Sequence, residues 1–151
     1  FRRFGNTMQE ALLIAIAHNN LATLTSIHSS VTQLGHSVCF EATNARQFVE
    51  KSKSHRPDLM IVQDRLPDGE GLQAAREAAR GDTIPTILII GTHNGELVDR
   101  AKSENVLAVL HEPVRQSDLA PALAIAMQRF EQLQKLRNQI DSLKHELEIG
   151  T

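Results

Sequence analysis

Short runs of apolar residues, separated by amphipathic stretches, constrain the fold of this chain more than any other feature. Ala11–Ala17 is apolar at every position, and similar runs occupy residues 59–62, 86–90 and 106–110. Ser37–Phe40 is a more mixed candidate of the same kind. Apolar runs bounded by polar residues are typical of strands that are buried on both faces of a parallel sheet. The sequence therefore predicts five strands in one buried sheet.

Helical patterns alternate with these strands. Apolar residues recur at steps of three and four between Leu21 and Leu34, and Gly35 follows as a natural helix stop. The alternation implies an α/β fold, a doubly wound parallel sheet with helices on both faces, whose site lies outside the carboxyl ends of the strands. The other predicted helices cover residues 44–54 with Asn44 as N-cap, 71–80, 95–104, and a last one from Ser117 with Pro121 in its first turn.

The last predicted helix is long enough to leave the domain. It contains no Gly or Pro between Pro121 and Gly150, and its apolar residues follow a heptad pattern with one three-residue stammer between Leu133 and Leu136. A domain of this size has no core left to cover the distal half, so we expect a homodimer through this helix; the alternative is a helix that continues unpaired into a further domain. The predicted dimerisation residues are Phe130, Leu133, Leu136, Ile140, Leu143 and Leu147.

Composition narrows the possible functions. The chain has 16 Lys+Arg against 18 Asp+Glu, and only 3% of its residues are aromatic, so we expect no nucleic-acid partner for this segment. The longest apolar run is too short to span a bilayer, so no membrane partner is expected. The single cysteine, Cys39, excludes an internal disulfide and fits a cytoplasmic location.

Several motifs resemble response-regulator receiver domains over residues 11–128. Pro57–Leu72, with its Leu-Pro-Asp-Gly stretch, is similar to the third strand and following loop of that family, and Glu112-Pro113 stands where the family has Lys-Pro. The resemblance implies a flavodoxin-like receiver fold with strand order 2-1-3-4-5 and an extended C-terminal helix. Residues 1–10 would form an N-terminal extension and 129–151 a coiled-coil extension. This combination is similar to antitermination regulators that carry an ANTAR RNA-binding module.

The family's phosphoryl-transfer chemistry is missing at nearly every matched position. The family's acceptor aspartate stands four residues before the loop proline and six after the preceding proline, and both counts end on Gln63. A carboxamide is not a phosphoryl acceptor, and Glu112 reverses the charge of the family's lysine. The resemblance thus implies a degenerate pocket whose remaining positions are Ala17, His18 and Asn19 for the acidic Mg²⁺ pair, and Ile90, Gly91 and Thr92 for the Thr/Ser position.

We expect Glu112 to accept a hydrogen bond from His18 or from the Gln63 amide, because all three lie at strand ends. Asp64 is a possible displaced acceptor, although neighbouring residues of a strand point to opposite faces. Asp68 fits a turn. We therefore expect a non-enzymatic pseudo-receiver without a resident metal or cofactor, Mg²⁺ being needed only if phosphorylation occurs, and a sensor protein or histidine kinase as possible partner. The alternatives are a working phosphorelay receiver that uses Asp64, and a small-molecule or metal-binding domain in which His18, His93 and His111 contribute.

Overall fold

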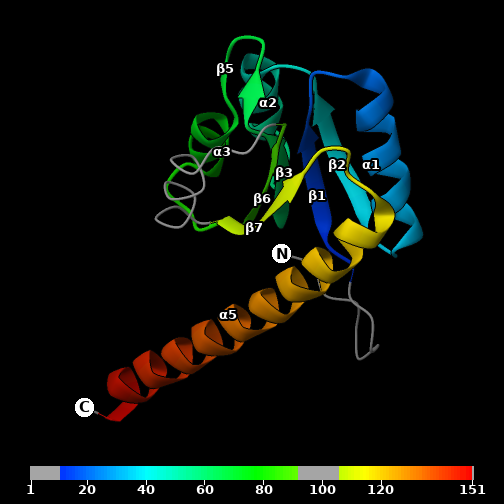
Figure 1. Ribbon diagram of the computed structural model, residues 1–151. Coiled ribbons are helices and arrows are strands. Elements are labelled where there is room, and N and C mark those ends of the chain that lie inside the picture. The colour runs from blue at the N-terminus through cyan, green and yellow to red at the C-terminus, as the bar shows by residue number, and fades with distance from the viewer. Residues whose placement is uncertain (1–10, 92–105, 151) are drawn as a thin grey trace.

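A five-stranded parallel sheet forms the centre of the molecule (Figure 1). The computed structural model describes residues 11–91 and 106–150. The strands lie in the order β2-β1-β3-β6-β7, which confirms the predicted order of the five sheet strands. Their bounds are β1 Leu13–Ala17, β2 Ser37–Ala42, β3 Leu59–Gln63, β6 Thr86–Ile90 and β7 Val106–His111.

Helices cover both faces of this sheet, as expected for a doubly wound fold (Figure 1). Asn44 is the N-cap of α2, as predicted, and its side chain accepts a hydrogen bond from the Gln47 backbone N–H. Gly35 has a φ of +96°, a left-handed conformation that suits glycine after a helix. The predicted helix over 95–104 lies outside the described residues. The described helices are α1 Leu21–Gln33, α2 Ala45–Ser52, α3 Gly71–Ala79 and α5 Gln116–Gly150.

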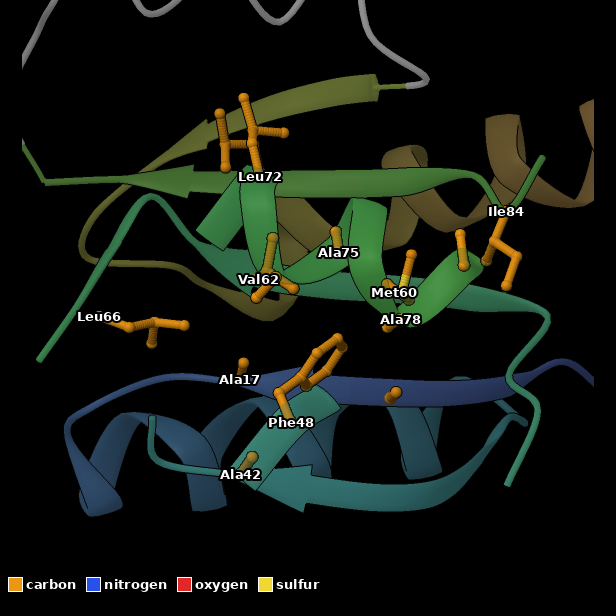
Figure 2. Packing of buried hydrophobic residues seen from close by; sticks show 14 of the residues in the cluster. Ala17, Ala42, Phe48, Met60, Val62, Leu66, Leu72, Ala75, Ala78 and Ile84 are labelled. Atoms are coloured by element: carbon orange, nitrogen blue, oxygen red, sulfur yellow. The ribbon is translucent and has the colours of Figure 1, made fainter. Parts of the chain in front are cut away.

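Two hydrophobic layers result, one on each face of the sheet. One contains α2 and α3, and Figure 2 shows its fully buried Phe48 in the same layer as Ala17, Met60 and the alanines of α3. The other contains α1 and the first turns of α5, with Ile27, Leu119 and Leu123 almost completely buried. The strands therefore bury side chains on both faces, which explains their continuous apolar runs.

A small antiparallel hairpin follows β3 and was not predicted. Its strands are β4 Arg65–Leu66 and β5 Gly69–Glu70, so Asp68 lies in the turn between them, as expected. The Asp68 carboxylate also accepts hydrogen bonds from the backbone N–H groups of Arg46 and Ala45. These bonds hold the pKa of Asp68 below its usual range. The hairpin is thereby fastened to the amino-terminal end of α2, a favourable place for a negative charge.

The start of α5 differs in one respect from the prediction. The helix begins at Gln116, and Asp118 accepts a hydrogen bond from the backbone N–H of Arg115, which fixes the first turn. Pro121 is thus the sixth residue of the helix and lies in its second turn, where the prediction placed it in the first. Because proline has no backbone N–H, the helix lacks the hydrogen bond that residue 121 would donate to the Ser117 carbonyl. The buried side chains of Leu119 and Leu123 nevertheless pack this part of the helix on the sheet.

His36 gives the fold a specific response to acid. It is buried between α1 and β2, its Nδ1 accepts a hydrogen bond from the Leu12 backbone N–H (3.0 Å), and burial lowers its pKa from 6.5. The unfolded chain therefore binds a proton more readily than the folded chain, so the free energy of unfolding should fall as the pH drops below about 6.5. We expect His36→Asn to flatten this slope between pH 7.5 and 5 in urea denaturation, because the Asn oxygen can accept the Leu12 bond without titrating.

The matched control for this experiment is His145→Asn, since His145 is exposed on α5. It should leave the wild-type slope unchanged. An unaltered slope in the His36 variant would mean that other groups carry the acid sensitivity.

Candidate functional site

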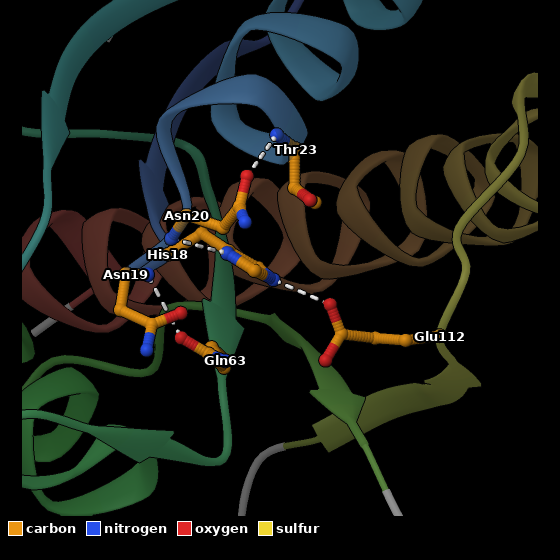
Figure 3. Close-up of polar contacts among 6 residues, drawn as sticks. All are labelled: His18, Asn19, Asn20, Thr23, Gln63 and Glu112. Atoms are coloured by element: carbon orange, nitrogen blue, oxygen red, sulfur yellow. Dashed lines mark hydrogen bonds and ion pairs between the residues drawn. The ribbon is translucent and has the colours of Figure 1, made fainter.

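Four of the predicted pocket residues meet at the carboxyl ends of β1, β3 and β7: His18, Asn19, Gln63 and Glu112 (Figure 3). Ala17 and Ile90 are fully buried at the ends of β1 and β6, while His18 and Asn19 begin the loop into α1. Gly91 is exposed, and a Cβ atom there would meet Glu112 Oε2 at 3.4 Å. Thr92 lies outside the described residues. Parallel strands bring residues that are distant in sequence to one edge, which is why the prediction could group them.

His18 is the centre of the site and is only 2% exposed. Its Nδ1 accepts a hydrogen bond from the Asn20 backbone N–H (3.0 Å), so the ring proton belongs on Nε2. Nε2 donates that proton to Glu112 Oε1 (2.6 Å), and Figure 3 shows the two side chains directed at one another. The expected bond between His18 and Glu112 is confirmed. It joins residues 94 positions apart in the chain.

Gln63 makes a different bond from the one considered for it. Its Oε1 accepts a hydrogen bond from the Asn19 backbone N–H (2.8 Å), and the side chain is 9% exposed. The amide thus holds the loop after β1 against the end of β3 (Figure 3). Gln63 and His18 together tie β1, β3 and the segment before α5 into one polar cluster.

Asp64 follows Gln63 but is held differently. Its backbone N–H donates to the Ile89 carbonyl (2.7 Å), and its own carbonyl accepts from the Gly71 N–H (2.9 Å). Burial raises the pKa of the Asp64 carboxyl, although the backbone N–H and charge of Arg65 act in the opposite direction. The charge of Glu112 also raises this pKa, so the Asp64 carboxyl lies within electrostatic range of the cluster, while Gln63 holds the position that bonds the loop after β1.

Sequence reasoning missed the part played by Asn20. Its backbone N–H fixes the His18 ring, and its Oδ1 accepts from the Thr23 N–H (3.0 Å), which makes it the N-cap of α1. The signal was present, because an asparagine directly before an amphipathic run is a typical N-cap.

The predicted dimerisation residues fall into two groups on α5. Phe130 packs against the domain's own core, and Leu133 is half-buried in a groove beside Pro57 and Pro85. These two side chains contact the domain that carries them, and their part in a dimer seam stays a prediction. The four remaining residues are exposed in the single chain: Leu136 54%, Ile140 51%, Leu143 59% and Leu147 70%.

Comparison with known proteins decides the family of this fold. Residues 14–124 match the model of the response regulator receiver domain. The chain belongs to this family. None of the described helices is long and apolar enough to cross a membrane.

The receiver domain has a sequence relative among curated regulators, and its fold is similar to several solved structures. It is 28% identical over 135 residues to the transcriptional regulatory protein PdtaR of Mycobacterium tuberculosis, covering 89% of this chain and 66% of PdtaR. A CheY-like receiver domain protein from Methanospirillum hungatei has a TM-score of 0.73 at 21% identity, with 82% of this chain and 98% of that chain covered. The anti-anti-sigma factor PhyR of Bartonella quintana has a TM-score of 0.74 at 21% identity, with 86% and 53% covered. The structural likenesses show the fold.

Receiver domains use Mg²⁺ when they are phosphorylated, so the fit of this cluster to Mg²⁺ matters. Mg²⁺ requires several oxygen ligands in octahedral geometry. Here Ala17 offers a methyl group, His18 offers an imidazole whose nitrogens are both engaged, and the Gln63 oxygen already accepts a bond. No group of three His, Cys, Asp or Glu residues is arranged for a metal ion within 11–91 and 106–150. These residues do not fit the family's Mg²⁺ site. His93, one of the three histidines of the zinc alternative, lies outside the described residues.

Proposed function

We propose that this receiver domain is a pseudo-receiver, which transmits a signal without phosphorylation of the pocket. The observation that carries the proposal is the closed polar cluster: Gln63 stands at the acceptor position with its oxygen bonded to the Asn19 N–H, and Glu112 is bonded to His18. The two residues that would accept and neutralise a phosphoryl group in the family are thus replaced by Gln63 and Glu112, each of which is hydrogen-bonded within the loop after β1. The proposal assigns no catalysis to the domain.

The cluster is coupled to the output through the chain itself. Glu112 follows β7 directly and precedes α5 by only three residues, so its bond to His18 fixes the segment that leads into α5. A sensor protein or kinase that binds near these strand ends and alters this bond would alter how α5 leaves the sheet. The bond therefore takes the place that phosphorylation has in the family.

The output, in this proposal, is helix-mediated dimerisation that positions a downstream effector. Four exposed apolar residues on α5 support the pairing, because a solvated helix without packing is marginal. The relative PdtaR is named a transcriptional regulatory protein, and the chain spans 66% of its length. In this proposal the downstream effector is an RNA-binding antitermination module, and the protein is a cytoplasmic regulator. The name of PdtaR and the resemblance of the Leu-Pro-Asp-Gly stretch to antitermination regulators support this choice.

Intact mass spectrometry tests the proposal directly. The chain is incubated with Mg²⁺ and a small phosphodonor beside Asp64→Asn and the matched control Asp141→Asn, whose carboxylate is exposed on α5. We expect no added phosphoryl group in any of the three. A phosphoryl group that appears in the wild type and in Asp141→Asn but vanishes in Asp64→Asn would overturn the proposal and favour a phosphorelay receiver that uses Asp64.

A further inference from the structure

A groove lies between α5 and the edge of the sheet at which the strands begin, far from the strand-end cluster. Its volume is about 370 Å³. Figure 1 shows α5 crossing this edge of the sheet on its way out of the domain. The apolar residues that line the groove come from the segments before β3 and β6 and from α5: Pro57, Ile84, Pro85, Phe130 and Leu133. The groove therefore offers an apolar lining beside the last turns of α5 that contact the domain.

The chain enters the sheet directly beside this groove. Asp58 lines the groove and also holds the start of β1, because its Oδ2 accepts from the Leu13 N–H (2.9 Å) and its own N–H donates to the Leu13 carbonyl (2.7 Å). Residues 1–10 thus join the described chain within a few positions of the groove. Ten residues span up to about 33 Å. The groove follows α5 from Phe130 to Arg137, about 10 Å, so this segment is long enough to lie along it.

The composition of residues 1–10 complements the groove. The segment begins Phe-Arg-Arg-Phe and so carries two of the five phenylalanines of the chain around two positive charges. Among the charged groups of the groove, Arg56 already donates to two carbonyls at the end of α3 and is paired with Asp82. The Asp58 carboxylate adds a negative charge where the chain enters, and arginine binds carboxylates strongly. Arg137 is the groove residue farthest along α5, so a cationic segment is favoured near Asp58.

We infer that the groove binds residues 1–4 of its own chain, with Phe4 against Phe130 and Leu133 and the two arginines beside Asp58. Because the segment is attached to the domain by only a few residues, its effective concentration at the groove is about millimolar, and a weak intrinsic affinity suffices. The same residues of a second copy lack this advantage.

Binding of this segment has a consequence for α5. The bound segment packs on Leu133, the point at which α5 loses contact with the domain, and it joins that turn of the helix to the edge of the sheet. Its release leaves this turn with fewer contacts. Residues 1–10 thus provide a control over the direction of α5 that is separate from the bond between His18 and Glu112.

Disulfide formation within one chain tests where the segment binds. In a Cys39→Ala background, Gly5→Cys is combined with Gln134→Cys, and in the matched control with Lys135→Cys. Gln134 lines the groove, whereas Lys135 is the next residue and is exposed outside it. Both variants are oxidised with glutathione disulfide at low protein concentration. We expect the disulfide within the chain to form at least about tenfold faster with Gln134→Cys, because a disulfide needs close Cα atoms. Equal rates, or a disulfide only between two chains, would overturn the inference.

Tryptophan fluorescence gives an independent readout, since the chain contains no tryptophan of its own. Phe4→Trp should emit at short wavelength and resist quenching by acrylamide. Adding Thr83→Arg should shift the emission to longer wavelength and increase the quenching, because Thr83 is an exposed residue of the groove and an arginine there opposes the positive segment. The matched control adds Ser142→Arg, at an exposed position of α5 outside the groove, and should retain the protected emission. Identical quenching of all three chains would contradict binding in the groove.

Discussion

Gly71→Ala is expected to lower the free energy of unfolding of this receiver domain by about 3 kcal/mol or more. A Cβ atom at Gly71 would lie 1.8 Å from the backbone oxygen of Gln63 and 2.9 Å from its carbonyl carbon. Both are backbone atoms at the end of β3, in the middle of the sheet, so no flexible side chain can give way. The variant must move α3 or the end of β3, and either movement disturbs the Gln63 bond to Asn19. Urea denaturation followed by circular dichroism measures the loss.

Gly69→Ala is the matched control for this substitution. A Cβ atom at Gly69 would meet only the Ala45 Cβ, at 3.8 Å, which is ordinary contact. We expect a change of no more than about 1 kcal/mol. If Gly71→Ala proved as stable as Gly69→Ala, the close approach of α3 to Gln63 would not exist in solution.

Leu143→Asp is expected to raise the dissociation constant of self-association at least about a hundredfold, which corresponds to about 3 kcal/mol of association free energy. Leu143 is central in the exposed seam, and a carboxylate there would be buried against apolar side chains of the second copy. The same residue is 59% exposed in the single chain, so folding of the receiver domain should be unaffected. Sedimentation equilibrium measures association, and circular dichroism at the same concentration checks the fold.

Ser142→Asp provides the matched control, because it adds the same charge one residue away, at an exposed position outside the seam. It should associate like the wild type. Association of Leu143→Asp at wild-type strength would exclude the seam as the interface and leave α5 unpaired.

The sheet was predictable because its strands are buried on both faces. A run such as Thr86–Ile90 is continuous in apolar character, and the structure places β6 over the same residues. The hairpin of β4 and β5 was not predictable in this way, since strands of two residues have no periodicity. Its position depends on Asp68, whose bonds to α2 join parts of the chain more than twenty residues apart.

The site was predictable in position but only partly in its bonds. The numbers of residues that separate Gln63 from Pro57 and from Pro67 identified it as the acceptor position. The parallel topology predicted that His18 and Glu112 lie at the same edge of the sheet. The partner of Gln63 is a backbone N–H, which no residue pattern marks. Phe130 shows another limit, because helical spacing identifies an apolar face without saying what covers it, and this side chain packs on its own domain.

The unbroken length of α5 has a mechanical consequence. The helix runs from Gln116 to Gly150 without interruption, and the part beyond Leu133 extends about 25 Å from the domain. The distal end lies about 40 Å beyond Leu123, so a tilt of about 10° at the base of this stiff helix displaces that end by about 7 Å. Such a tilt requires only a small change in the packing of Leu119 and Leu123 beneath the first turns. The helix therefore acts as a lever that amplifies sub-ångström changes at the sheet into movements comparable to the width of a side chain.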